Sequence, residues 1–169
     1  TLLGSTPEQV HAAHRELVRV GIDNAVGQAT GGPEVWLEDP AGAQRLEQVD
    51  FHGVAGALAA GTDICLLDTR QVLEWESGHI AGAVFMPFYE VADRLGEIPR
   101  DKPVYVYCGS GYRAAAVASL LQHQGFTNIV HIDDDFADAA AAGLTVVAED
   151  APEREPGWTW IASRAAVRE

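Results

Sequence analysis

The sequence has few cysteines, few basic residues and no long apolar run. Two cysteines in 169 residues cannot form a disulfide framework, which favours a reducing, cytoplasmic setting. Eleven Lys and Arg residues stand against 25 Asp and Glu residues, for a formal net charge of −14. Nucleic acids and anionic membranes are both bound through clustered basic residues, so neither is an expected partner.

The termini also lack familiar signals. No apolar run reaches transmembrane length, and no charged-then-apolar leader is present. The chain starts at Thr1 instead of Met, which fits a piece of a longer protein.

What the chain does contain is an apolar content of 47%, enough for one domain of ordinary size with an appendage. The most informative stretch is residues 104–124, VYVYCGSGYRAAAVASLLQHQ. Its first four residues, Val104–Tyr107, are β-branched or aromatic, which predicts a strand buried on both faces. Arg113–Gln124 is rich in Ala and Leu and stops at Gly125, which predicts a helix with a glycine C-cap.

The turn between this strand and this helix places Cys108 where open α/β sheets bind their ligands. Gly109 and Gly111 allow successive amide N–H groups to face inward and cradle an anion. The helix N-terminus and Arg113 add positive charge, and such surroundings favour a thiolate over a thiol. The alternative interpretation of Cys108 is a buried structural cysteine. The other cysteine, Cys65, is expected to be a small buried hydrophobic residue.

Two motifs of the sequence resemble those of the rhodanese-type sulfurtransferases, and they occur in the order and at the spacing found in that family. The first, Cys108-x-x-Gly111-x-Arg113, is similar to the active-site loop of that family. The second is similar to the family pattern L-D-x-R … E-x-x-x-G-H-I-x-G-A … P, and it comprises Leu66–Arg70, Glu74–Ala83 and Pro87. The resemblance covers residues 47–148. It implies a rhodanese-like α/β fold, in which a parallel sheet is flanked by helices.

The resemblance also implies residue roles. Cys108 would attack the outer sulfur of a donor and become a persulfide, beside the cationic Arg113. The substrate-binding residues of the loop would be Gly109, Ser110, Gly111 and Tyr112. Supporting residues would be Asp68, Arg70 and His79. We expect Asp68 to accept hydrogen bonds from neighbouring backbone or arginine, and Arg70 to pair with Glu74, to which it is suitably spaced.

The expected donor is thiosulfate or a low-molecular-weight persulfide such as glutathione persulfide, and the expected acceptor is a thiol or cyanide. No cofactor or metal is expected. Arg113 is the only cation in the loop, and the chain as a whole carries a net charge of −14. The negative charge of the protein should therefore repel the thiosulfate dianion more than such a persulfide. A Cys-dependent phosphatase and a non-catalytic rhodanese-like binding module stay open as alternatives. The four residues between Cys108 and Arg113 form a small ring of amides that suits one sulfur atom better than a phosphoryl group.

Residues 1–36 resemble half of a second rhodanese domain that has lost its nucleophile. A helix is predicted from Pro7 to Val20, with Thr6 as its N-cap. When Gly21–Asn24 is aligned with Gly125–Asn128 and one residue of slack is allowed, Leu3 falls where Cys108 stands. Fusion proteins in which a metallo-β-lactamase-like domain precedes rhodanese domains end in this way, so an upstream domain of that kind is an expected partner.

We expect a linker at residues 37–49, a catalytic domain at 50–148 and a C-terminal tail at 149–169. Further predicted helices and strands of the catalytic domain are Phe51–Ala60, Ile64–Leu67, Val84–Met86, Tyr89–Leu95, Ile129–Ile132 and Phe136–Ala142. Asp133–Asp135 departs from the family, in which a Gly-Gly pair is usual. Helix capping and exposure to solvent are expected there, with cation binding as the alternative, and the acidic run puts in doubt a close backbone approach at this turn.

Overall fold

The structure is a computed structural model, and it describes residues 1–36 and 45–148. The chain divides into two compact units, Thr1–Arg45 and Leu46–Glu169. The predicted tail at 149–169 and most of the predicted linker lie outside the described residues. No helix in the described ranges is long and apolar enough to cross a membrane.

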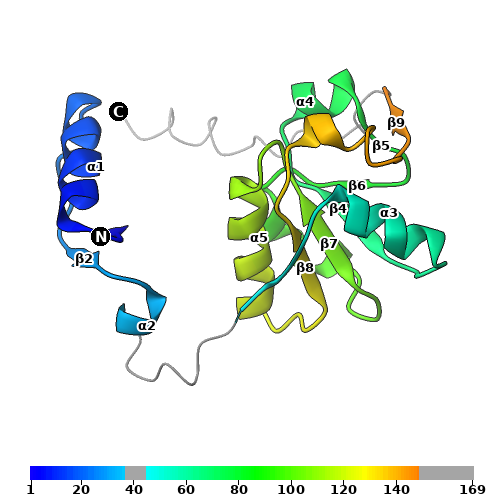
Figure 1. The fold of residues 1–169 in the computed structure, drawn as a ribbon, viewed down its shortest axis with the longest axis horizontal. Helices are drawn as coiled ribbons and strands as arrows, with labels where there is room; N and C mark the ends of the chain where they lie inside the picture. The colour runs from blue at the N-terminus through cyan, green and yellow to red at the C-terminus, as the bar shows by residue number, and fades with distance from the viewer. Residues whose placement is uncertain (37–44, 149–169) are drawn as a thin grey trace, which may run out of the picture. The chain divides into compact units, whose positions relative to one another are not determined.

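The first unit is a β-α-β element followed by a short helix (Figure 1). Its two strands pair in parallel, and the helix between them begins at the predicted N-cap Thr6, which forms a capping box with Gln9. Its elements are β1 (Leu2–Gly4), α1 (Pro7–Arg19), β2 (Gln28–Thr30) and α2 (Pro33–Trp36).

Only part of the apolar face of α1 is covered within this unit. Val10 is 2% exposed, whereas Val20 just beyond the helix is 72% exposed. The order β1–α1–β2 is the order expected of half a rhodanese domain. The match is imperfect, because the alignment of Gly21 with Gly125 puts Val26 at the position of Val130 in a strand, whereas β2 starts two residues later, at Gln28. The origin of this unit as a domain remnant therefore stays a prediction.

The second unit is built on a five-stranded sheet with the order β3-β8-β7-β4-β6, and each neighbouring pair in it is parallel (Figure 1). Its strands are β3 (Glu47–Val49), β4 (Cys65–Asp68), β6 (Val84–Phe85), β7 (Val104–Tyr107) and β8 (Ile129–Ile132). Its α-helices are α3 (Phe51–Ala59), α4 (Val72–Ser77) and α5 (Tyr112–His123). A separate antiparallel pair joins β5 (His79–Ile80) to β9 (Val146–Val147). The predicted parallel α/β architecture is confirmed.

The sheet is covered on both faces. Because side chains alternate along each strand, neighbouring residues of a strand pack in different apolar clusters, one on each face. On one face, Val104 and Val106 of β7 pack in a cluster with apolar residues of α5. On the other face, Tyr107 packs in a cluster with Phe51 of α3 and Ile132 of β8. Figure 1 shows α5 and α3 on opposite sides of the sheet. The alternation also sends Cys108, which directly follows β7, to the α5 face, where it lies in the same cluster as Val106.

Three segments differ from the prediction. Glu47–Val49, expected at the end of the linker, is the edge strand β3 and pairs with β8. The predicted helix at 89–95 is replaced by two 3-10 turns, Val91–Asp93 and Leu95–Glu97. The predicted helix at 136–142 is the single 3-10 turn Phe136–Asp138. Segments this short gain few hydrogen bonds per ordered residue, so local packing decides which kind of turn they make.

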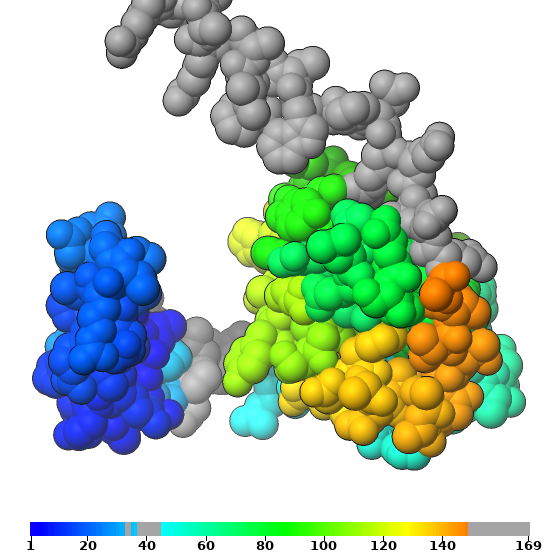
Figure 2. Space-filling view, turned by 90° about the horizontal axis from the view of Figure 1, so that it is seen from above, coloured from blue at the N-terminus to red at the C-terminus, as the bar shows by residue number. Residues whose placement is uncertain are grey.

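The segment that follows β8 reaches the surface of the second unit. Figure 2 shows this orange segment lying against residues coloured green, in agreement with the pairing of β9 and β5. Ala81 N donates to Thr145 O at 2.8 Å, which extends the contact beyond the two short strands.

Candidate active site

The nucleophile candidate, Cys108, lies at the carboxyl end of β7 and immediately before α5. Its side chain is 1% exposed and packs in the cluster that includes Ala114 and Val117 of α5. Gly111 is the N-cap of α5 and has φ = +85°, a conformation that non-glycine residues rarely adopt. This glycine lets the chain turn sharply from the strand into the helix directly after Cys108.

The loop leaves its amide groups available. None of the N–H groups of residues 109–113 donates a hydrogen bond to another residue of the described chain. The carbonyl groups, in contrast, are engaged: Gly109 O accepts from Phe136 N at 2.9 Å, and Gly111 O accepts from Ala115 N at 2.8 Å. Because the helix N-terminus carries a partial positive charge, free amides at this point suit an anionic atom.

Arg113 lies across this loop and is paired with Glu74 of α4. Its Nη1 lies 2.6 Å from Glu74 Oε2 and its Nη2 lies 2.7 Å from Glu74 Oε1, a bidentate pair. The hydrogen bonds from Arg113 are the main cause of a lowered pKa of Glu74. The hydrogen bonds to Glu74 are the main cause of a raised pKa of Arg113, and Cys108 contributes to the same shift. Arg113 is thus held over the start of the loop, at the residue that follows Cys108.

The ion pair leaves little room for a side chain at position 109, which is a glycine. A Cβ atom at Gly109 would lie 3.0 Å from Arg113 Nη2 and 3.4 Å from Glu74 Oε1. The predicted pairing of Glu74 with Arg70 is wrong. The short helix α4 directs Glu74 to the loop, while Arg70 is held by another carboxylate. The other two loop side chains, Ser110 and Tyr112, are exposed, Tyr112 by 86%.

Asp68 and Arg70 form a buried pair at the end of β4. Arg70 donates from Nη2 to Asp68 Oδ2 at 2.7 Å and from its backbone N to Asp68 Oδ1 at 2.9 Å. A further bond runs from Arg70 Nη2 to Gly78 O at 2.7 Å, and the guanidinium carbon lies 3.6 Å from the ring centre of Phe136. The expectation that Asp68 accepts from backbone and arginine is met. This pair joins β4, the loop before β5 and the turn after β8.

His79 contacts a different set of residues. It is 3% exposed, and its ring stacks on Trp75 with 3.4 Å between ring centres. Its Nδ1 lies 3.1 Å from Trp75 O; since a carbonyl only accepts, this nitrogen donates. No contact of His79 within the described chain reaches residues 108–113. The structure thus brings Cys108, Arg113 and the glycines together, and it places Asp68, Arg70 and His79 in the surrounding framework.

The acidic run at the end of β8 caps the elements beside it. Asp134 Oδ2 accepts from Phe51 N at 3.0 Å, at the start of α3. Asp135 Oδ1 accepts from Ala137 N at 3.0 Å. The hydrogen bond from Phe136 N to Gly109 O keeps the backbone of this turn close to the loop. The doubt about a close approach is thereby removed, and capping is the observed role of Asp134 and Asp135.

Two residues beside the loop were not identified as site residues from sequence. One is Glu74, whose partner is 39 positions away. The other is His131, which is 3% exposed within β8. Its Nε2 donates to Gly111 O at 3.0 Å, and its Nδ1 then accepts from Gln48 Nε2 at 3.3 Å. A histidine inside the otherwise apolar strand IVHI is a signal that could have pointed to it.

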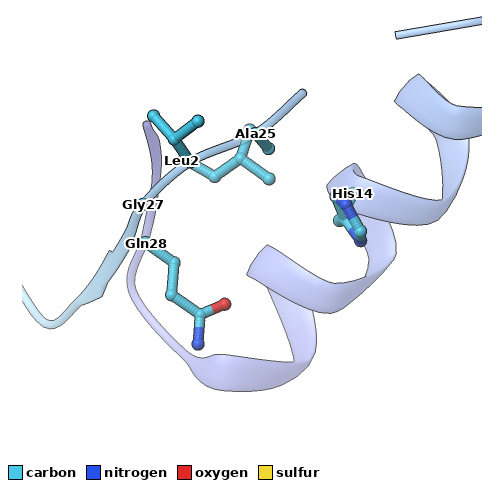
Figure 3. Close-up of a pocket in the computed structure, with 6 residues that line it drawn as sticks. Leu2, His14, Ala25, Gly27 and Gln28 are labelled. Carbon is cyan, nitrogen blue, oxygen red and sulfur yellow. The ribbon is translucent and has the colours of Figure 1, made fainter. Parts of the chain in front are cut away.

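The first unit holds a cavity of about 270 Å³, shown in Figure 3. It opens beside Leu2 and Gln28, which are register partners at the amino ends of β1 and β2. Parallel sheets bind ligands at the opposite, carboxyl ends of their strands, so this cavity is a poor candidate for the chemistry. Among the described residues, no group of three or more His, Cys, Asp or Glu side chains is arranged to hold a metal ion.

Comparison with known proteins agrees with this geometry. The model of the rhodanese-like domain family matches residues 53–142. A sulfurtransferase from Allochromatium vinosum is 30% identical over 105 residues, which cover 62% of this chain and 98% of the relative. The thiosulfate sulfurtransferase GlpE from Pseudomonas syringae is 34% identical over 71 residues, which cover 42% of this chain and 67% of the relative.

Solved structures have the same fold. A rhodanese-related protein from Thermoplasma volcanium aligns with a TM-score of 0.55 and 27% identity, over 61% of this chain and 99% of that protein. A protein from Rhodopseudomonas palustris, described as a possible tyrosine phosphatase, aligns with a TM-score of 0.54 and 22% identity, over 60% of this chain and 85% of that protein. The second likeness concerns the fold alone.

The fold and the loop define an α/β protein with a cysteine between the end of a central strand and the start of a helix. The chain belongs to the rhodanese-like domain family. Its relatives include named sulfurtransferases, which supports a rhodanese-type role in sulfur transfer.

Proposed function

We propose that this chain is a sulfurtransferase that moves a sulfane sulfur through a persulfide on Cys108. The observation that carries the proposal is the loop itself. The Cys108 thiol at the end of β7 is followed directly by residues 109–113, whose amides donate to no other described residue, and Arg113 Nη2 lies at the Gly109 position of this loop. Amides and a cation at a helix N-terminus stabilise negative charge on sulfur.

The reaction has two displacement steps. The Cys108 thiolate attacks the outer sulfur of the donor, and a new S–S bond forms at Cys108. The bond between that sulfur and the rest of the donor breaks, and its electron pair leaves with sulfite or with a thiolate. An acceptor thiolate or cyanide then attacks the outer sulfur of the persulfide, and Cys108 leaves as the thiolate again. Neither step requires an external oxidant or reductant.

In this mechanism the loop residues Gly109, Ser110, Gly111 and Tyr112 bind the substrate. The amides hold the transferred sulfur as an anion, and the exposed Tyr112 ring lies free to contact the carrier of that sulfur. Asp68, Arg70 and His79 support the framework around the loop. A low-molecular-weight sulfur donor and a thiol acceptor are the partners. Cys65 and Cys108 are not joined in a disulfide, which suits a reducing cytoplasm.

The donor is thiosulfate or a low-molecular-weight persulfide such as glutathione persulfide. GlpE from Pseudomonas syringae is named for the first of these donors.

A phosphatase is disfavoured because Cys108 is 1% exposed within a short loop. A single terminal sulfur atom reaches such a thiol more readily than a phosphate ester does. A binding module without chemistry leaves unexplained why a loop with free amides and an arginine directly follows a cysteine.

Mass spectrometry after exposure to a sulfane-sulfur donor tests the proposal. We expect a gain of one sulfur atom on Cys108 and none on Cys65, whose pKa is raised chiefly by burial. Cys108→Ser should abolish turnover without loss of the fold, whereas Cys65→Ala should retain sulfur loading. Full sulfurtransferase activity in a folded Cys108→Ser variant would refute the mechanism. Release of phosphate from an ester by the unmodified chain, without sulfur loading, would favour the phosphatase.

A further inference from the structure

Two carboxylates flank the Cys108 loop, one on each side. Glu74 Oε1 lies 3.4 Å from the position that a Cβ atom would take on Gly109. Asp133 Oδ1 lies 2.6 Å from the corresponding position on Gly111. Neither carboxylate belongs to the loop, because Glu74 comes from α4 and Asp133 follows β8. Gly111 therefore has an unpaired carboxylate beside it, whereas Gly109 has the Glu74–Arg113 ion pair beside it, with Arg113 Nη2 at 3.0 Å.

The positive charge near the loop is largely neutralised. Arg113, the only basic residue of the loop, has both of its Nη atoms on Glu74. The other basic residues in the described part of the second unit are also engaged. Arg70 pairs with Asp68, Arg94 with Glu90 and Glu97, and Lys102 with Asp63, while Arg100 lies over the Phe126 ring at 3.8 Å. Arg100 alone among these described residues has no carboxylate partner, and its contacts are with Phe126 and the Gln124 carbonyl, at the opposite end of α5 from the loop.

This distribution distinguishes donors by where they carry charge. In thiosulfate the sulfonate is bonded directly to the sulfane sulfur, so its negative charge must come to the loop together with the reacting atom. An alkyl persulfide brings at most one negative charge to the loop, on its outer sulfur when that sulfur is deprotonated, and any carboxylate is several bonds away. Glu74 is half-buried and Asp133 is exposed, and at separations of a few ångströms, well within a Debye length, salt screens their charges only in part. The difference in repulsion between the two donors is therefore largest at this point.

We propose that Glu74 and Asp133 select the sulfur donor by charge, so that the site takes sulfane sulfur from an alkyl persulfide in preference to thiosulfate. This inference rests on the proposed sulfur transfer through Cys108. Glu74 acts in two ways, since its own charge repels an anion and its ion pair occupies Arg113. Asp133 acts by its charge alone, because no described residue forms an ion pair with it.

The test compares the kcat/KM values for thiosulfate and glutathione persulfide in Glu74→Gln and Asp133→Asn. Both replacements remove a charge and keep the shape, and a Gln at position 74 can still serve as the capping-box residue for Gln71. Removing one charge about 6 Å from a dianion should raise kcat/KM for thiosulfate roughly tenfold. For Asp133→Asn, the value with glutathione persulfide should rise by no more than about threefold, because that donor brings at most one charge to the loop.

The matched control is Glu76→Gln on the same helix. Glu76 is exposed and lies two residues beyond Glu74, which places it on another face of α4. The same loss of one charge there should leave the donor ratio unchanged. In the unmodified chain, added salt should raise kcat/KM for thiosulfate, and this rise should be smaller in Asp133→Asn.

The donor ratio decides the inference. A shift toward thiosulfate in Glu74→Gln or Asp133→Asn that exceeds the shift in Glu76→Gln supports it. An unchanged ratio in both variants, with sulfur loading of Cys108 intact, overturns it and leaves the proposed function in place. Absence of sulfur loading with either donor in the unmodified chain would instead refute the proposed function. Asp133→Asn answers the question alone if loss of the Glu74 pair prevents folding.

Discussion

At the scale of single residues, the shape of the active-site loop depends on side chains outside it. His131 illustrates this, because it reaches from the buried strand β8 to the carbonyl of Gly111. Gln48 of β3 holds the other nitrogen of the ring, so the imidazole has both a fixed position and a fixed tautomer. The hydrogen bond turns the Gly111 carbonyl away from the cradle. The same peptide links Gly111 to Tyr112, so its N–H group is positioned with the carbonyl.

We therefore predict that His131→Ala slows sulfur loading of Cys108 and lowers stability by about 1–3 kcal/mol, since it removes a buried hydrogen bond and leaves Gln48 without its partner. His131→Gln, whose amide nitrogen can reach a similar position, should restore much of the loading rate. The measurements are single-turnover mass spectrometry and urea denaturation. His52→Ala on the exposed surface of α3 is the control and should behave as the unmodified chain. Equal loading rates in His131→Ala and the unmodified chain would contradict the positioning role.

At the scale of secondary structure, the helices place different demands on their glycines. Gly111 starts α5 with φ = +85°, and a Cβ atom there would meet Asp133 Oδ1 at 2.6 Å. Gly56 lies within α3, and a Cβ atom there would meet no heavy atom within 4 Å. The first glycine is required by the backbone and by its neighbour, whereas the second only weakens a helix.

The same substitution should thus have opposite effects at these two positions. Gly111→Ala should lower stability by at least about 1–2 kcal/mol, the cost of a left-handed conformation for a residue with a Cβ atom, and should reduce sulfur loading. Gly56→Ala should raise stability by roughly 0.5–1 kcal/mol and leave loading unchanged. Urea midpoints and loading rates of the two variants check both statements. A Gly111→Ala variant that is as stable and as active as the unmodified chain would show that this turn tolerates a side chain.

At the scale of the whole molecule, the boundary of the catalytic unit lies earlier than the sequence pattern suggested. The strand β3 completes the sheet beside β8, and Asp133 N donates to Val49 O at 3.0 Å. Val49 also packs against the buried cluster of α3. The few residues before Asp50 therefore hold both the edge of the sheet and the start of the acidic turn that approaches the loop.

Two truncated chains separate these contributions. A chain that begins at Leu46 should load sulfur on Cys108 at a rate close to that of the full chain, because it keeps β3 and the Gln48 contact to His131. A chain that begins at Asp50 should have a lower urea midpoint and a slower loading rate, because β8 becomes an unprotected edge strand. Loss of loading in a folded chain that begins at Leu46 would show that the first unit belongs to the site. Equal behaviour of the two truncated chains would show that β3 is dispensable.

Much of this protein follows from local patterns in its sequence. The strands Val104–Tyr107 and Ile129–Ile132 have the predicted bounds, and the helix after the loop starts one residue before the prediction, at Tyr112. A β-branched run, a glycine pair or a capping residue acts within a few positions of itself, so its effect can be recognised without knowledge of the fold. The order and spacing of the Cys108 and Asp68 motifs were sufficient to identify the family.

The partners of the charged residues depended on the tertiary structure. Glu74 lies four positions from Arg70 and 39 from Arg113, yet it pairs with Arg113 because the sheet brings α4 next to the loop. A three-residue edge strand such as β3 carries too short a pattern to be distinguished from a linker, and it forms because β8 offers it hydrogen bonds. Which carboxylates stand beside Cys108 is a property of chain segments that meet only after folding, since the energy of a charge depends on its neighbours in space.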